Sequence, residues 1–289
     1  MPNLLDIRRR IKSVKNTQQI TKAMKMVSAA KLKRAQDRIL AARPYAKKMA
    51  VVLGSLASRA NRTHHPLLRK SETVTRIELL VVTSDRGLCG AFNTNIVRKA
   101  VEFIRERQAQ GYTVTVSLIG RKARDFFRRR PWPRRQEWVG VFDRLSYEHG
   151  LDIGGDIVEQ FRQGTFDELY IVYNEFKSAI QQRVVVEKLL PIESLEQEAE
   201  GPAIGGYLFE PDEADLLKIL LPKHIEIQTF HALLESSAAE LGARMAAMDG
   251  ASRNAGELIK KLTLYYNKTR QATITKELMD VVGGAEALR

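Results

Sequence analysis

Residues 223–282 read KHIEIQTFHALLESSAAELGARMAAMDGASRNAGELIKKLTLYYNKTRQATITKELMDVV, a stretch with no proline. Apolar and small residues recur along its second half in a four-three rhythm, the repeat of a helix that packs along another helix. The pattern predicts one long helix, whose serine and alanine positions let a partner approach closely. The repeat consists of Leu241, Met245, Met248, Ser252, Ala255, Ile259, Leu262, Tyr266 and Thr269.

The start of the chain predicts the partner. Residues 3–58 contain one proline, Pro44, which should kink the helix or bend its end. At 1.5 Å per residue the two segments would be about 84 and 90 Å long, whereas a globule of this length has a diameter of roughly 50 Å. We therefore expect an antiparallel pair within the chain, with an intermolecular coiled coil as the alternative. The expected apolar stripe is Leu4, Ile7, Ile11 and Val14, then, somewhat shifted, Ile20, Met24, Val27, Leu32, Ala35 and Ile39.

The charge of the chain is concentrated in its first helix. The net charge is +13, and residues 1–40 hold eleven lysines and arginines against Asp6 and Asp37, so they supply +9 of it. This excess favours an acidic or polyanionic partner, although charge runs are more often solvated faces. One cysteine, Cys89, excludes an internal disulfide. No apolar run is long enough to cross a bilayer, and the amino-terminal residues lack a secretory signal's apolar core.

The middle of the chain has the pattern of an α/β domain. Apolar strand patterns at 76–83, 113–119, 168–173 and 183–186 alternate with helix patterns at 95–110, near 121–127 and at 151–162. Alternation of this kind predicts a mostly parallel, Rossmann-like sheet. Residues 191–206 read as a flexible acidic connection. We therefore predict a helix at 1–60, a globular domain at 70–208 and a second long helix at 209–289.

No pattern of residues predicts a catalytic centre. The loop at 83–90 lies where a doubly wound sheet holds phosphate, but it matches no glycine-rich phosphate motif. Cys89 reads as a small packed side chain, and His64-His65-Pro66 reads as a surface loop because no second ligand pair accompanies it. We expect no catalytic residue, no metal and no cofactor. The apolar tip, residues 281–288, is expected either to be sheathed by a partner or to fold back on its own helix.

Three blocks of sequence resemble the gamma subunit of F-type ATP synthases, and the resemblance runs from about residue 4 to 288. The first begins at Ile7-Arg8-Arg9-Arg10-Ile11 and continues through Asn16 to Val27. The second is Thr83-Ser84-Asp85-Arg86-Gly87-Leu88-Cys89-Gly90. The third is Ala243-Arg244-Met245-Ala246-Ala247-Met248, followed by residues 266–275.

The resemblance implies a rotor in the central stalk, present in one copy per complex. In that family the paired helices fill the bore of a hexamer of alpha and beta subunits, which carry the nucleotide sites. The globular part contacts the epsilon subunit and the membrane ring of c subunits, at the cytoplasmic side of a bacterial inner membrane. The resemblance places Tyr207 and Glu210 at the epsilon and ring contact. It places Arg8, Arg9, Lys22, Met24, Arg270 and Gln271 against the hexamer.

Two other classes of protein remain as alternatives. A nucleic-acid-binding coiled coil is suggested by the basic first helix and by Arg128-Arg129-Arg130 with Arg134-Arg135. Sparse aromatic residues on the long helices count against base stacking, so we expect no nucleic-acid partner. A Rossmann-like nucleotide-binding enzyme with helical appendages is the second alternative.

Overall fold

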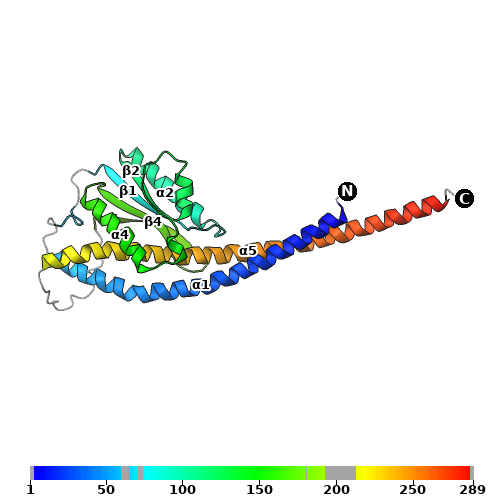
Figure 1. Ribbon diagram of the computed structural model, residues 1–289, viewed down its shortest axis with the longest axis horizontal. Coiled ribbons are helices and arrows are strands. Elements are labelled where there is room, and N and C mark those ends of the chain that lie inside the picture. Colours follow the sequence, from blue (N-terminus) through cyan, green and yellow to red (C-terminus); the bar gives the residue numbers. More distant parts are fainter. Residues whose placement is uncertain (1–2, 60–64, 70–73, 180, 193–212, 287–289) are drawn as a thin grey trace. The chain divides into compact units, whose positions relative to one another are not determined.

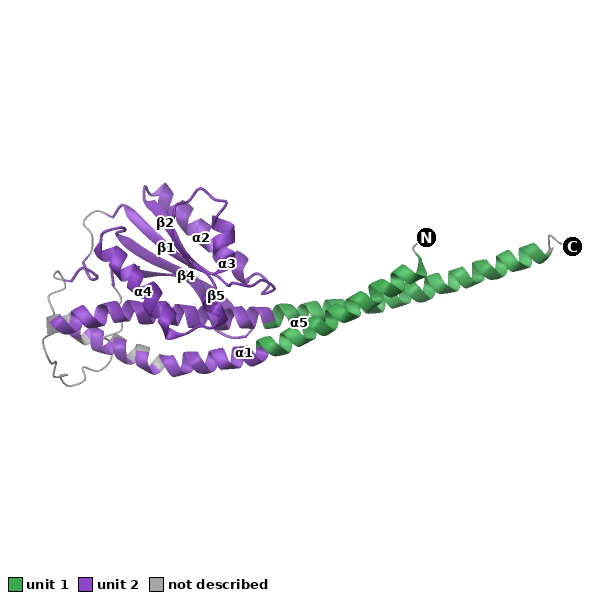
Figure 2. Ribbon diagram, viewed as in Figure 1, with its two compact units in different colours: residues 1–28, 245–289 green, residues 29–244 purple. Residues whose placement is uncertain are grey.

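A computed structural model describes residues 3–59, 65–69, 74–179, 181–192 and 213–286. These residues divide into two units, which we treat separately: unit 1 comprises residues 1–28 and 245–289, and unit 2 comprises residues 29–244 (Figure 2). The two long helices, α1 (Leu4–Arg59) and α5 (Glu213–Glu286), each contribute to both units. α1 continues through Pro44 as far as Arg59. α5 begins at Glu213, ten residues before the proline-free stretch 223–282.

Unit 1 is an antiparallel pair of helices. Arg8 contacts Tyr266, Gln18 contacts Ser252 and Lys25 contacts Asp249, so residue numbers rise along α1 as they fall along α5. The intramolecular pair expected from the sequence is therefore confirmed. Between residues 253 and 273 the side chains that are not exposed fall at Ala255, Gly256, Ile259, Leu262, Tyr266, Thr269 and Thr273. The four-three repeat predicted for this helix is the seam of the pair.

The seam on α1 differs from the expected stripe. Ile20 and Val27 are 60% and 55% exposed, whereas Thr21 and Ser28 are buried. The shift predicted after Val14 is therefore wrong: the three-four spacing continues without interruption through polar residues. A small hydroxyl side chain fits between closely packed helices and can donate to a backbone carbonyl of its own helix, as Thr21 does to Gln18 at 3.0 Å.

Unit 2 contains a five-stranded sheet in the order β3-β2-β1-β4-β5 (Figure 1). Its strands are β1 (Arg76–Val82), β2 (Thr113–Ile119), β3 (Arg134–Trp138), β4 (Glu168–Phe176) and β5 (Gln182–Leu190). The first four are parallel, and β5 pairs antiparallel with β4. The mostly parallel sheet is confirmed, but β3 was not predicted, because its arginines and the prolines before it hide the strand pattern.

Helices cover both faces of this sheet. α2 (Phe92–Ala109) and α3 (Arg121–Phe127) cover the face that carries Leu79 and Val81. The opposite face, with Leu80 and Val82, packs against α4 (Tyr147–Arg162) and the unit-2 parts of α1 and α5. Alternate residues of β1 thus enter two separate apolar cores, and both faces are dry, as expected for parallel strands. A 3-10 turn, η2 (Val141–Asp143), precedes α4.

α4 lies unusually close to α5. A Cβ placed on Gly154 would lie 2.7 Å from the Cα of Glu226, and one on Gly150 would lie 2.7 Å from the Cβ of Phe230. The two glycines are four residues apart and therefore share one face of α4. Their missing side chains allow the backbone of α4 to approach α5. Whether the chain divides functionally at 60, 70 and 208, as the sequence suggests, stays a prediction.

Candidate interaction surfaces

The six residues expected to face a hexamer all lie in unit 1, and five of them, all except Met24, are exposed. Arg9 is 81% exposed and lies 3.9 Å from Asp6. Lys22, Arg270 and Gln271 are also exposed. Met24 differs, because it is half-buried in the seam of the helix pair. A role for Met24 in contacting another chain therefore rests on the exposed part of its side chain alone.

Arg8 joins the two helices. Its Nη2 atom donates to the hydroxyl of Tyr266 at 2.7 Å, and its guanidinium carbon lies 5.7 Å from the centre of that ring. This contact fixes the register, so Arg270, one turn beyond Tyr266, lies near Arg8. The structure therefore gathers Arg8, Arg9, Arg270 and Gln271 in one region. Lys22 and Met24 lie about 20 Å further along α1, at 1.5 Å per residue.

Unit 1 also exposes apolar side chains. Single exposed apolar residues are normal on soluble proteins, but a series along one helix pair indicates a surface that another protein covers. Sequence reasoning missed part of this series, because it assigned Ile20 and Val27 to the seam. The most exposed members on the paired part are Leu5, Ile20, Met26, Val27 and Leu264.

The last turns of α5 have no partner from α1. Tyr266 is level with Arg8, and α1 begins at Leu4, so the pairing ends within about two turns of Tyr266. Residues 274–285 are all exposed, so α5 continues alone beyond about residue 274. Val281 and Val282 are 71% and 61% exposed there, and the helix continues to Glu286. The alternative in which the tip folds back on its own helix is therefore wrong for residues 281–286. The apolar side chains of the tip stay uncovered within this chain.

In unit 2 the loop after β1 holds a carboxylate where related folds hold phosphate. Asp85 accepts hydrogen bonds from the backbone amides of Arg121 at 3.0 Å, Gly140 at 2.9 Å and Phe142 at 3.3 Å. Backbone amides that converge in this way form an anion site. The protein's own carboxylate occupies it, so the amides that would bind a phosphate here are already used.

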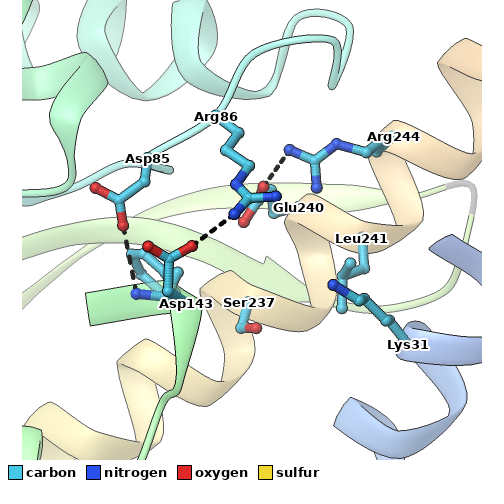
Figure 3. Close-up of a pocket in the computed structure, with 9 residues that line it drawn as sticks. Lys31, Asp85, Arg86, Asp143, Ser237, Glu240, Leu241 and Arg244 are labelled. Carbon is cyan, nitrogen blue, oxygen red and sulfur yellow. Dashed lines mark hydrogen bonds and ion pairs between the residues drawn. The ribbon is translucent and has the colours of Figure 1, made fainter. Parts of the chain in front are cut away.

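The same loop contacts α5 through a hydrogen bond, and two ion pairs lie beside that contact (Figure 3). Arg244 donates to the carbonyl of Gly87 at 3.2 Å and pairs with Glu240, while Arg86 pairs with Asp143 at 2.9 Å. Burial raises the pKa of Glu240, and the neighbouring Arg244 opposes that rise. The groups line a small pocket of about 120 Å³. Its two arginines are paired with Asp143 and Glu240, so these four groups are already engaged.

Those of the remaining residues singled out in the sequence that the structure describes do not form a reactive site. Cys89 is buried, and burial raises the pKa of its thiol, so it is a packed side chain rather than a nucleophile. Among the described residues no group of three or more histidine, cysteine or acidic side chains is arranged to hold a metal ion. His64, Tyr207 and Glu210 lie outside the described residues, as does most of the predicted acidic connection.

Comparisons with known proteins identify the family of this chain. A family model described as ATP synthase matches residues 3–288. A protein from Solibacter usitatus named ATP synthase gamma chain is 51% identical over 291 residues, covering 99% of each chain. The chain belongs to the family of ATP synthase gamma chains. Family members of that name from Anaeromyxobacter sp. and Pelotomaculum thermopropionicum are 50% and 48% identical, each covering 100% of both chains.

Solved structures agree with this family. The central stalk and c-ring structure of Tetrahymena thermophila mitochondrial ATP synthase contains a chain that is 26% identical, with a TM-score of 0.61. The match covers 81% of this chain and 99% of that one. A chain of the Euglena gracilis mitochondrial ATP synthase shares the fold with a TM-score of 0.67 at 22% identity. Over the described residues, every helix is too short or too polar to span a bilayer.

Proposed function

We propose that this chain is the rotating central-stalk subunit of an F-type ATP synthase. It transmits torque between an ion-driven ring of c subunits in the membrane and a hexamer of alpha and beta subunits that synthesises or hydrolyses ATP. The observation that carries the proposal is the antiparallel helix pair of unit 1, with its cationic and apolar exposed surface. A shaft needs stiffness and a surface for its bearing, and it needs no reactive centre of its own.

The exposed cations suit contacts that must break and re-form. Ion pairs at a solvent-exposed surface contribute roughly 0–1 kcal/mol each, so a rotating shaft can exchange them at small energetic cost. Arg9, Lys22 and Arg270 are exposed in this way. We assign them, with Arg8, Met24 and Gln271, to contacts with the hexamer. In this proposal the catalytic sites lie on the beta subunits, and the gamma-type chain is not itself an enzyme.

The remaining partners follow from the same proposal. Tyr207 and Glu210, which directly precede α5, are assigned to contacts with the epsilon subunit and the c ring. The relatives at about 50% identity are bacterial, which favours a complex bound to the inner membrane with this chain on its cytoplasmic side. The chain then associates with the membrane through the complex, as one copy.

The two alternative functions each lose one motivating observation. Arg135 is buried between Glu78 and Asp156, so it is not available to nucleic acid. Asp85 fills the place of a phosphate in the loop after β1. Family membership favours neither a nucleic-acid-binding protein nor a Rossmann-like enzyme.

A rotation measurement tests the proposed function. A Cys89→Ser, Arg105→Cys double variant would carry one exposed cysteine on α2, to which a bead is attached after assembly with alpha and beta subunits. We expect ATP to drive rotation of the bead in one direction, and the same complex without ATP serves as the control. If the complex hydrolyses ATP while the bead only fluctuates, the proposed rotation of this chain is refuted. ATP turnover by the isolated chain would favour the alternative of a Rossmann-like enzyme.

A further inference from the structure

A second, larger pocket of unit 2 adjoins the one in Figure 3 and has a different charge. It encloses about 350 Å³ between α1, the turn η2 and α5. Lys31, Arg34 and Arg38 line it from α1, and Arg144 lines it from the residue after η2. The volume lies within the range of about 300–1,000 Å³ that is usual for sites of small molecules. The pocket is therefore large enough for more than a single ion.

The cations of this pocket are not neutralised by the protein. Asp143 is its one lining carboxylate, and Arg86 already binds it at 2.9 Å. Arg38 donates to the carbonyl of Leu145 at 3.4 Å. Over the described residues, Lys31, Arg34 and Arg144 make neither an ion pair nor a hydrogen bond. Three positive charges thus converge on one cavity without a counter-charge from the chain.

The arrangement carries an electrostatic cost that a bound anion would remove. Lys31, Arg34 and Arg38 are spaced by three and four residues, so they share one face of α1 and repel one another. Arg144 adds a fourth charge from a different element. Phe142, Leu234 and Leu241 add apolar side chains to the lining of the pocket. The smaller neighbouring pocket, by contrast, balances its arginines with Asp143 and Glu240.

We propose that this pocket binds a polyphosphate group, in an inorganic polyphosphate or at the phosphate end of a nucleotide. Guanidinium groups bind phosphate oxygens through paired hydrogen bonds, and the charge of two or three linked phosphates matches the number of unpaired cations. A linked chain of phosphates offers separate oxygens to the cations of α1 and to Arg144. The site is separate from the loop of Asp85, and the inference does not depend on the proposed rotation.

Calorimetric titration of the full chain with sodium tripolyphosphate, without magnesium and at low salt, tests the proposal. We expect saturable binding at one site. Arg34→Gln and Arg144→Gln, changes on two different elements, should each weaken it about tenfold or more, as loss of a charge-assisted hydrogen bond does. Lys15→Gln is the matched control, because Lys15 is an exposed lysine of unit 1 outside the pocket. Circular dichroism checks that each variant is folded.

Three further titrations separate the sources of the phosphate. If ATP binds more tightly than tripolyphosphate, the apolar lining residues also contact the nucleotide base. If the two bind equally, the site recognises the phosphate chain alone. AMP should bind at least about tenfold more weakly than ATP, because it brings one phosphate. The proposal is overturned if tripolyphosphate does not saturate, or if Lys15→Gln weakens binding as much as Arg34→Gln. It is also overturned if a glutamate-rich peptide of equal charge competes as well as tripolyphosphate, since the pocket would then take an acidic protein segment.

Discussion

Arg244 donates a hydrogen bond from Nη2 to the backbone carbonyl of Gly87, at 3.2 Å. The contact joins α5 to the loop after β1, two segments separated by more than half of the chain. The same guanidinium pairs with Glu240, one turn earlier on α5. Both side chains are largely buried, with 12% and 9% of their surface exposed. One arginine therefore holds the sheet domain against α5 and neutralises a buried acid.

Replacing this arginine should destabilise unit 2. Arg244→Met leaves Glu240 buried without its partner, and removing one member of a buried ion pair costs about 3–5 kcal/mol. Urea denaturation followed by circular dichroism measures the loss. The double variant Arg244→Met, Glu240→Gln should recover part of it, because the unpaired charge is gone. Equal stability of the single and double variants would contradict this account.

The Arg244→Met variant should also respond to pH. Burial raises the pKa of Glu240 in the folded protein, and removing Arg244 takes away the group that opposes this rise. The folded variant then binds a proton more tightly than the unfolded chain, so its stability should increase as pH is lowered from 8 towards 5. The double variant lacks the titrating carboxyl and should show a smaller increase over the same range. The difference between the two curves isolates Glu240.

Asp167 should stabilise the protein in a manner that acid removes. Burial of its carboxyl is outweighed by hydrogen bonds from the Arg76 side chain and from the amides of Thr75 and Arg76, which hold its pKa at about 2. Its folded pKa lies below the unfolded value of 3.8, so its contribution is present above about pH 4 and is lost as pH falls towards 2. Asp167→Asn should cost about 1–2 kcal/mol at pH 7. Asp125→Asn, on an exposed acid, should change stability by less than about 0.5 kcal/mol.

Two adjacent glycines of α4 should respond oppositely to alanine. Gly155 has nothing within 4 Å of its would-be Cβ, so Gly155→Ala should stabilise by about 0.5–1 kcal/mol through the helix preference of alanine. Gly154→Ala forces a methyl group against the backbone of Glu226, and overpacking of this kind costs about 1–3 kcal/mol. Thermal unfolding of the two variants compares them directly. Stabilisation by both would mean that α4 and α5 are not in close contact.

Exposed cations of unit 1 should matter for coupling rather than for folding. Arg9→Ala and Arg270→Ala remove side chains that contact water, so the free energy of unfolding should change by less than about 0.5 kcal/mol. In the assembled complex, ATP-driven ion pumping should fall by a larger factor than ATP hydrolysis. Arg98→Ala, an exposed change on α2, is the control. Unchanged pumping in both unit-1 variants would remove Arg9 and Arg270 from the proposed hexamer contact.

The seam of the helix pair should tolerate change less than the tip. Ile259→Pro interrupts α5 where its side chain packs in the seam, at a cost of about 3 kcal/mol or more. Deleting the chain from Val282 onward removes a segment whose described residues, 282–285, are exposed. We expect the deletion to assemble with alpha and beta subunits and the proline variant to assemble poorly, as measured by gel filtration. Ile259→Leu should behave as wild type.

The sequence predicted the long helices because apolar residues recur at helical spacing through segments that contain almost no proline. It predicted β1 because a buried parallel strand is continuously apolar, and β2 because its apolar residues alternate. The sequence misled the assignment where polar residues occupy buried positions. Thr21 and Ser28 lie in the seam of α1, so the apolar Ile20 and Val27 beside them misled the assignment. β3 escaped notice because Arg135 is neutralised by Glu78 and Asp156, residues distant in sequence.

Some candidate sites could be predicted from sequence motifs, and others form only in the folded chain. Family motifs selected Arg9 and Arg270, and their exposure agrees with a surface role. No local pattern could reveal that Asp85 binds three amides from two other segments, because those segments meet only in the folded chain. The cationic pocket likewise combines α1 with Arg144, which lies far away in sequence.

Beyond about residue 274, α5 continues as a single helix, whereas its preceding turns are paired with α1. A single helix bends and twists more readily than a pair bound along a seam. The residues assigned to the hexamer and to the ring all precede this end, so torque between those contacts passes through the paired section. The single-helix end can therefore bend sideways and follow an imperfectly aligned bearing without loosening the transmission.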